Sequence, residues 1–197
     1  MKRFIRYYKW HLLFALLVII CLSFAVFNIT TTISPDIVVT YADVRYIDTQ
    51  VFNDNKYLWE HLLQDANGDD KKAAVLSAYT ADYQRDLDEL FVKLVEEDTS
   101  DIYVLSKTTF ENFEDKSVFV DARTYANINE ERTETLKDSN GKIYAVSLEG
   151  NKFVKNLGII DSTDLYIGVC ETTDGELTTF RKNGRNIAST IIDSDNN

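Results

Sequence analysis

The sequence predicts an α/β protein in which an N-terminal transmembrane helix precedes one three-layer domain with a mostly parallel β-sheet. An almost uninterrupted apolar run covers residues 10–29. The rest of the 197-residue chain is long enough for one domain with a hydrophobic core and too short for two. Beyond Pro35, short β-branched runs alternate with segments of helical spacing, a pattern typical of a parallel sheet covered on both faces.

The apolar run has the length of a membrane span, because 20 residues at about 1.5 Å each cross a hydrocarbon core of about 30 Å. Four basic residues precede it, and the first acidic residue of the chain is Asp36. Positive flanks remain on the cytoplasmic side of a membrane. We therefore expect a single-pass protein of the cell membrane with its C-terminal domain extracellular. Its parts are a cytoplasmic tail (1–9), a transmembrane helix (10–29), a linker (30–36) and an extracytoplasmic α/β domain (37–197).

The N-terminal segment has two other possible interpretations. A cleaved signal peptide has a shorter apolar region of about 7–15 residues and a small-x-small cleavage site, and residues 27–34 offer no such site. A lipoprotein would use Cys21 as its lipid attachment point. However, Ile20 stands where a small residue is expected, and the apolar run continues beyond the cysteine.

Charge and cysteine content narrow the choice of partners and compartment. Four of the 21 basic residues precede the apolar run, which leaves 17 basic residues against 32 acidic ones in the rest of the chain. Such an acidic surface repels phosphate backbones, so no nucleic-acid partner is expected. Only Cys170 lies beyond the apolar run, so the domain has no intramolecular disulfide. A cysteine-poor outer domain suits a bacterial, Gram-positive surface.

The domain begins with a strand and a helix. The β-branched residues of 36–44 predict a buried strand. Residues 52–66 place their apolar side chains on one helical face, with Asn53 or Asp54 as the N-cap.

The middle of the domain repeats this order. Residues 73–80 predict a second strand, and residues 82–98 have the most regular helical spacing in the chain. A third strand is predicted at 101–106, followed by a short helix or turn at 108–115. Residues 117–128 give no single pattern.

The last part is predicted to contain a polar loop, two strands and two helices. Residues 127–142 are polar and end in an Asn140-Gly141 turn. A short helix is predicted to end at Gly158, and the closing helix to tolerate Gly184. The predicted ranges are strands at 143–148 and 164–170 and helices at 150–158 and 176–193.

One loop has oxygen ligands at alternating positions. Asp65, Asn67 and Asp69 flank Gly68 as ligands do in a calcium loop, which makes them candidate Ca²⁺ ligands and Ca²⁺ the one candidate cofactor. Counted from Asp65, an EF-hand loop requires Gly at position 6 and Glu at position 12, where this chain has other residues. The alternative is a turn, because an Asn-Gly pair after a helix supplies a left-handed residue that ends it.

Three phrases in the domain resemble a known family. "PDIVVTYAD", "SDIYVLSKTTFENFEDKSVFVDA" and "GKIYAVSLE" are similar to the first lobe of the extracellular solute-binding proteins of bacterial ABC transporters, the type 2 periplasmic-binding-protein group. The similarity concerns the order of elements over residues 35–170. The domain resembles even more closely the membrane-anchored proteins of Firmicutes that carry one such lobe. The family's proline in the last phrase is replaced here by Ser147 or Leu148.

The resemblance implies the fold of a single lobe and a role in binding. A clamshell binding protein holds its ligand between two lobes, and this chain has room for one. A lone lobe requires a second chain to enclose a small ligand, so no transport activity is transferred to it. Tyr125 and Tyr144 lie where loops gather at the strand ends of an open α/β sheet. They are the candidate ligand-binding residues, with core packing as the alternative.

An enzymatic interpretation starts from Cys170, which ends a strand and has Arg181 downstream. This outline is similar to sortases, which need a thiolate, an arginine and a histidine. The only histidine of the domain is His61, on a predicted helix, and sortases are β-barrels. A small buried cysteine is the alternative, and no catalytic residue is assigned.

These observations predict a non-catalytic, membrane-anchored binding or accessory module, associated with an ABC transporter or another membrane or envelope protein as partner. The alternative is a structural or adaptor domain that makes only protein contacts. A sortase-like thiol enzyme is the third interpretation.

Overall fold

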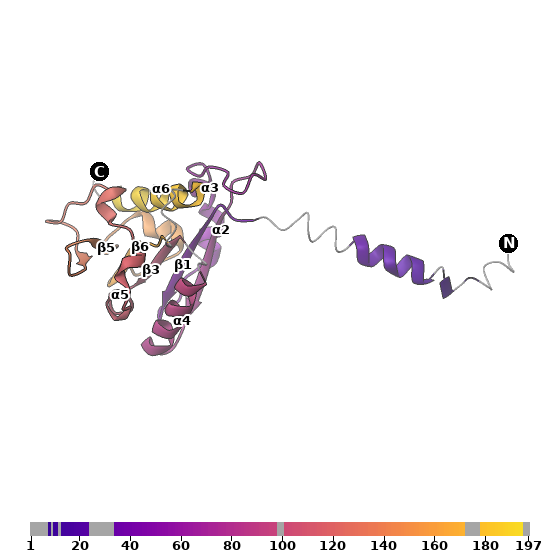
Figure 1. The fold of residues 1–197 in the computed structure, drawn as a ribbon, viewed down its shortest axis with the longest axis horizontal. Helices are drawn as coiled ribbons and strands as arrows, with labels where there is room; N and C mark the ends of the chain where they lie inside the picture. The colour runs from indigo at the N-terminus through magenta and orange to yellow at the C-terminus, as the bar shows by residue number, and fades with distance from the viewer. Residues whose placement is uncertain are drawn as a thin grey trace. The chain divides into compact units, whose positions relative to one another are not determined.

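The computed structural model describes residues 8, 10, 11, 13–23, 34–97, 101–171 and 178–194. The chain divides into two compact units, residues 1–34 and residues 35–197, which are described separately. The second unit contains the sheet and all the labelled helices (Figure 1).

In the first unit, the described residues 8, 10, 11 and 13–23 are helical. Among the described residues, no helix combines the length and the apolar character that a membrane crossing requires. Residues 12 and 24–29 of the predicted span lie outside the described residues. The predictions of a transmembrane helix at 10–29, of a single-pass membrane protein and of an extracellular C-terminal domain are therefore wrong.

The second unit is built on one six-stranded sheet. Its strand order is β2-β1-β3-β6-β5-β4. β1 pairs in parallel with β2 and β3, whereas β6 is antiparallel to both β3 and β5, and β4 is antiparallel to β5. The strands are β1 (Ile37–Asp43), β2 (Ala74–Thr80), β3 (Ile102–Ser106), β4 (Thr135–Lys137), β5 (Ile143–Ser147) and β6 (Leu165–Val169).

The sheet is therefore mixed, and the prediction of a mostly parallel sheet is wrong. Helices connect β1 to β2 and β2 to β3, and these strands are the parallel ones. The later connections contain no such crossover. β4 and β5 form a hairpin through a tight turn in which Gly141 has φ +79°, and the segment from β5 to β6 contains only a short 3-10 helix.

Helices cover both faces of the sheet. Figure 1 shows α6 along one side of the strands and α4 with α5 along the other. The helices are α2 (Thr49–Asn55), α3 (Tyr57–Glu60), α4 (Gln84–Glu96), α5 (Lys107–Asn112) and α6 (Thr179–Asp193), with 3-10 helices η1 (Lys116–Val118), η2 (Ala122–Thr124) and η3 (Phe153–Leu157).

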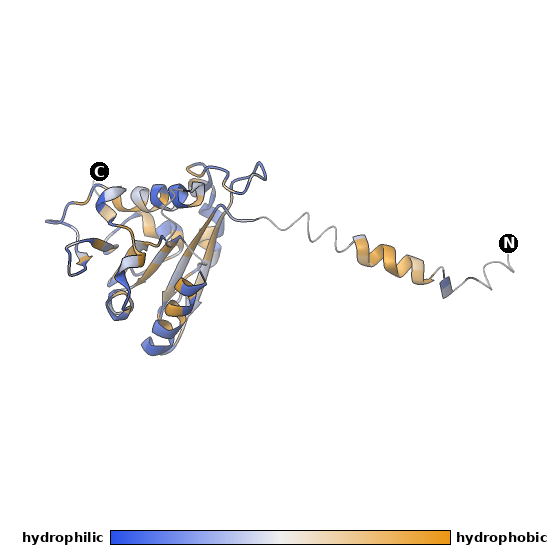
Figure 2. Cartoon of the chain, in the orientation of Figure 1, coloured by the Kyte–Doolittle hydropathy of each residue, from blue (hydrophilic) through white to orange (hydrophobic). Residues whose placement is uncertain are grey.

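Two hydrophobic clusters fill the spaces between the layers. In one, α2, α3, η3 and α6 pack on the sheet around Trp59 and Ile187. In the other, α4, α5 and the residue after η1 pack on the sheet around Phe91, Phe110 and Phe119. Figure 2 shows hydrophobic residues along the strands and a mixture of hydrophobic and hydrophilic residues around α4. This mixture reflects the helical spacing that the sequence shows, because only one face of α4 is buried.

Several local elements differ from the predicted ones. The first helix begins earlier than predicted, because Asp48 and not Asn53 or Asp54 is its N-cap, accepting a hydrogen bond from the Gln50 N–H. It is also interrupted, giving α2 and α3. The predicted polar loop at 127–142 contains the short strand β4. The predicted end of a short helix at Gly158 is confirmed, with φ +80°.

A buried amide ties α6 to the start of the sheet. Asn183 is fully buried, and its Oδ1 accepts a hydrogen bond from the Gln64 N–H at 2.8 Å. Its Nδ2 donates to the carbonyl oxygens of Gln64 at 2.8 Å and Asp36 at 3.2 Å. Next to it, a Cβ on Gly184 would lie 3.1 Å from the Cβ of Asp101, so the glycine allows the helix to approach the sheet closely.

Candidate functional site

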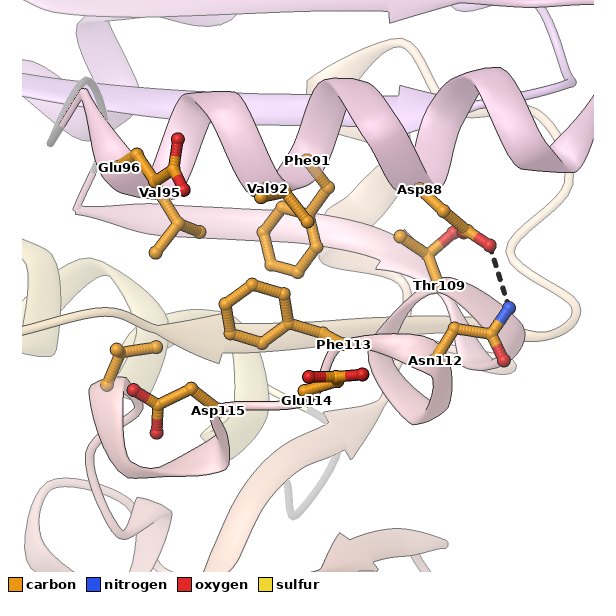
Figure 3. A pocket seen from close by; sticks show the side chains of 11 residues that line it. Asp88, Phe91, Val92, Val95, Glu96, Thr109, Asn112, Phe113, Glu114 and Asp115 are labelled. Carbon is orange, nitrogen blue, oxygen red and sulfur yellow. Dashed lines mark hydrogen bonds between the residues drawn. The ribbon is translucent and has the colours of Figure 1, made fainter.

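The candidate site is a groove on the α4 side of the sheet, between α4 and the segment 109–118. The inner face of α4 is buried through Leu87, Phe91 and Leu94. Asp88, Val92 and Glu96 follow one another at intervals of four residues, so they lie along one line on the helix surface. This line forms one wall of the groove (Figure 3).

The opposite wall is made by α5 and by the chain that follows it. Ser106 is the N-cap of α5, and its Oγ accepts a hydrogen bond from the Thr109 N–H at 3.2 Å. The helix ends at Asn112, and Phe113 then adopts an extended conformation with ψ 125°. This change of direction brings Phe113 into the groove and leaves Glu114 and Asp115 on its rim (Figure 3).

A polar network joins the two walls at one end of the groove. The Asp88 carboxylate accepts hydrogen bonds from Gln84 Nε2 at 2.7 Å and from Asn112 Nδ2 at 2.7 Å. Gln84 Nε2 also donates to Thr109 Oγ1 at 2.6 Å. Because α4 and α5 each supply partners, the width of the groove is set by hydrogen bonds as well as by packing.

Two lysines support the outer wall from behind. Lys116 Nζ donates to the carbonyl oxygens of Phe110 at 2.7 Å, Glu111 at 3.0 Å and Phe113, at the end of α5. Lys142 Nζ donates to the carbonyl oxygens of Lys116 at 2.9 Å and Phe119 at 2.8 Å. Burial lowers the pKa of the Lys116 ammonium group. Neither lysine lines the groove.

The floor of the groove is part of an aromatic cluster. The Phe91 and Phe113 ring centroids are 4.8 Å apart, and the Phe91 and Tyr103 centroids are 5.1 Å apart. Phe119 packs behind them, with its centroid 5.9 Å from that of Phe113. Contacts of this kind hold rings in fixed orientations, so the floor is preformed.

The groove combines this apolar floor with an acidic rim. It has a volume of about 540 Å³, within the range of about 300–1,000 Å³ that is usual for ligand sites. No basic side chain is among its lining residues. Those residues are the carboxylates Asp88, Glu96, Glu114 and Asp115, the apolar Phe91, Val92, Val95, Phe113 and Val118, and the polar Thr109 and Asn112.

The rim carboxylates take part in no ion pair among the described residues. The hydroxyl and the N–H of Ser117 donate to the Asp115 carboxylate at 2.5 Å and 3.0 Å, which lowers its pKa below the ordinary value. An apolar surface bordered by free anions is suited to a ligand that is both apolar and cationic.

Comparison of the chain with protein-family models, with curated proteins and with solved structures finds no match. A functional proposal for this chain therefore rests on its sequence and on the geometry of the described residues.

The two tyrosines proposed as ligand-binding residues lie apart. Tyr144 is 3% exposed and belongs to the aromatic cluster under the groove, with Lys116 Nζ 5.4 Å from its ring centroid. Tyr125 packs against the cluster on the other face of the sheet, where burial raises its pKa. Its hydroxyl has no hydrogen-bond partner among the described residues. The structure does not bring the two rings together, and neither lines the groove.

The candidate calcium ligands lie in an exposed loop and accept hydrogen bonds from its own backbone. Asp65 accepts from the N–H groups of Gly68 at 2.7 Å and Asp70 at 2.9 Å. Asn67 Oδ1 accepts from Asp69 N–H at 2.9 Å, and Gly68 has φ +76°. No group of three or more His, Cys, Asp or Glu side chains in the described ranges is placed to hold a metal ion. Calcium binding stays a prediction.

The three residues of the thiol-enzyme interpretation are also separated. Cys170 is 5% exposed and belongs to the aromatic cluster on the α4 side. His61 is exposed at the end of α3, which packs on the opposite face, and its Nδ1 lies 3.3 Å from the Tyr57 carbonyl oxygen. Arg181 lies in the first turn of α6, on that same face.

The groove residues were not singled out from the sequence, although two signals pointed to them. Phe110 and Phe113 are three residues apart and precede the adjacent acids Glu114 and Asp115. The predicted helix at 82–98 carries carboxylates beside its apolar face. The two segments meet because α4 leads into β3 and α5 follows β3, which places both helices beside the same strand.

Proposed function

We propose that residues 35–194 form a non-catalytic binding module and that the groove between α4 and residues 109–118 is its binding site. The observation that carries the proposal is the apolar floor of Phe91 and Phe113 inside a rim of unpaired carboxylates. The solute-binding-protein resemblance of the sequence supports a binding role but names no ligand.

The proposed occupant is a short segment of a partner protein that carries both apolar and basic side chains. The groove lies along a helix and is open to solvent, which suits an amphipathic segment whose apolar face enters and whose basic residues meet the rim. The excess of 32 acidic over 17 basic residues after position 10 attracts such a segment over a distance. A partner of this chemistry also fits the expectation of an accessory module.

Binding is measured by fluorescence anisotropy with the full chain and labelled peptides. The probe is an amphipathic Leu/Lys peptide, and its two controls replace every Lys by Glu or every Leu by Ser. We expect the Leu/Lys peptide to bind and both controls to bind at least about tenfold more weakly, since each lacks one of the two required features. Equal binding of the Glu peptide would contradict the proposal, as would equal binding of the Ser peptide.

Charge variants locate the site. Glu96 and Glu114 line the groove, whereas Glu89 and Glu97 are exposed residues of the same region that do not. The double change Glu96→Gln/Glu114→Gln should weaken binding about threefold to tenfold, because each exposed charge pair contributes about 0.2–1 kcal/mol. Glu89→Gln/Glu97→Gln, which changes the net charge equally, should leave the affinity unchanged. Equal effects of both pairs would assign the attraction to net charge alone.

An apolar variant tests the floor and wall. Val92 is 41% exposed and lines the groove, and Val44 is 53% exposed and lies at the end of β1. Val92→Ser should weaken binding of the Leu/Lys peptide about fivefold, because about 1 kcal/mol of apolar burial is lost. Val44→Ser should leave the affinity unchanged. A thermal-shift series with arginine and spermidine separates a small cationic solute from a peptide. Stabilisation by these free cations in the absence of peptide binding would overturn the choice of occupant.

A further inference from the structure

The strand β2 is one edge of the sheet and is paired on one side only. Its seven residues pair with β1 in a continuous parallel register from Ile37↔Ala74 to Asp43↔Thr80. Within the described residues, the backbone hydrogen bonds of β2 run to β1 alone. One row of N–H and C=O groups along β2 is therefore available to another strand.

β2 has none of the features by which sheet edges avoid pairing. The sequence AVLSAYT contains no charged residue and no proline, and its register with β1 has no bulge. The strand at the other edge of the sheet, β4, has such protective features. β4 has three residues, includes Lys137, and has an irregularity in its register between Leu136 and Lys137. Short, bulged and lysine-bearing edges are protected edges, so only β2 is competent for strand addition.

We propose that β2 pairs with β2 of a second copy of this chain, antiparallel and across a twofold axis at Ser77. Such an interface is self-complementary, as a twofold dimer requires. In this register Val75 faces Tyr79 of the second copy, and Leu76 faces Ala78. Both pairs join uncharged side chains, and cross-strand pairs of this kind stabilise a sheet.

The charges that flank β2 select this partner and this register. Lys72 precedes the strand and Asp82 follows it, and both are exposed. Neither has an ion-pair partner in the described part of the chain. Around an axis at Ser77, Lys72 of each copy lies opposite Asp82 of the other. The edge is thus complementary to itself although the whole chain has a net charge of −11.

Cysteine cross-linking tests the register in the full chain. Directly opposed residues of antiparallel strands have Cα atoms about 4.5–5.5 Å apart, a distance that a disulfide spans. Ser77→Cys in a Cys21→Ser background should therefore give a disulfide-linked dimer on mild oxidation. Val75→Cys in the same background is the matched control, because in this register the two copies of residue 75 lie four residues apart along the strands, about 14 Å. Cys170 is buried and common to both. Absence of the Ser77→Cys dimer, or equal cross-linking of both variants, would overturn the proposal.

A charge-pairing experiment tests the same axis without oxidation. Ser77→Lys and Ser77→Asp each place like charges together at the axis, so each alone should sediment as a monomer under conditions where the unchanged chain is a dimer. An equimolar mixture should restore the dimer, because Lys then faces Asp. Circular dichroism of each variant establishes that it is folded. Variants that remain monomeric when mixed, or that self-associate as well as the unchanged chain, would contradict the twofold pairing. If β2 pairs with a different protein, the unchanged chain, both variants and their mixture should all sediment as monomers. That result would overturn the proposal.

Discussion

The buried amide of Asn183 gives the sharpest test of how this fold is held together. The change Asn183→Asp keeps the size and shape of the side chain. One oxygen still accepts the Gln64 N–H, but the second oxygen takes the place of Nδ2 and faces the carbonyl oxygens of Gln64 and Asp36. Two hydrogen bonds are lost, and a carboxylate is buried without a basic partner.

The expected loss of stability follows from these contacts. Each lost hydrogen bond contributes about 1 kcal/mol, and leaving a buried polar group unsatisfied costs about 1–3 kcal/mol more. We therefore expect Asn183→Asp to lower the free energy of unfolding by about 3–5 kcal/mol at pH 7, a large part of the about 5–15 kcal/mol of a typical domain. The measurement is urea unfolding of the full chain followed by circular dichroism.

The matched control is Asn186→Asp, the same chemical change on an exposed residue of the same helix. It should change stability by no more than about 0.5 kcal/mol. The difference between the two variants should also depend on pH. Burial raises the pKa of the new carboxyl group above its unfolded value of about 3.9, so the part of the penalty that comes from the buried charge is fully present above the folded-state pKa and disappears as the pH falls below about 3.9. A difference under 1 kcal/mol at pH 7, or one that does not shrink with falling pH, would refute this reasoning.

Three further changes test separate contacts. Gly158→Ala places a Cβ 2.0 Å from the Asp48 carbonyl oxygen at φ +80°, so urea unfolding should show a loss above about 2 kcal/mol. The Asp36 carboxylate accepts hydrogen bonds from two backbone N–H groups, at 2.7 Å and 2.8 Å. Asp36→Asn replaces one of the two oxygens by an NH2 group, so one backbone N–H then faces another donor. Thermal melts should show a loss of about 1–3 kcal/mol. The Lys107 ammonium, 2.7 Å away, lowers the pKa of Glu134. Glu134→Gln should therefore destabilise the domain only above the ordinary glutamate pKa, with the difference vanishing in acid.

The glycine and glutamate changes each have a control on the chain. Gly150 has φ +75° but open space around its Cβ position, so Gly150→Ala should have a smaller effect than Gly158→Ala. Glu131 has no ion pair in the described ranges, and Glu131→Gln should show no pH-dependent difference. An equal loss in both glycine variants, or a pH-dependent loss in Glu131→Gln, would show that the named contacts are not the cause.

Elements set by local physics were predictable from the sequence. The β-branched residues of β1, the regular apolar spacing of α4 and the left-handed glycine after η3 each depend on neighbours within a few positions. Strand direction was not predictable in this way. β6 lies between β3 and β5 and pairs with strands some twenty to sixty positions earlier in the chain, and no local pattern records that choice.

Two other differences have specific physical causes. The segment of β4 was predicted as loop because it lies in the polar run 127–142. Its strand has three residues, of which only Leu136 is buried, so there is no alternation to detect. The N-terminal run was predicted as a membrane span from its 20 apolar residues and its basic flank, whereas no helix among the described residues combines the length and the apolar character that a span requires. The groove was not predicted because its walls come from segments about twenty positions apart, and the local signal in each segment does not record that the two meet.

Hydrogen exchange of the full chain, with and without the Leu/Lys peptide, tests the central claim most directly. The groove predicts slower exchange on binding at residues 84–96 and 109–118, with no change along β1 or α6. It also predicts that this protection is weaker in Glu96→Gln/Glu114→Gln at a peptide concentration near the dissociation constant of the unchanged chain. Protection at other elements alone, or none while the peptide is bound, would contradict the assignment of this groove as the binding site.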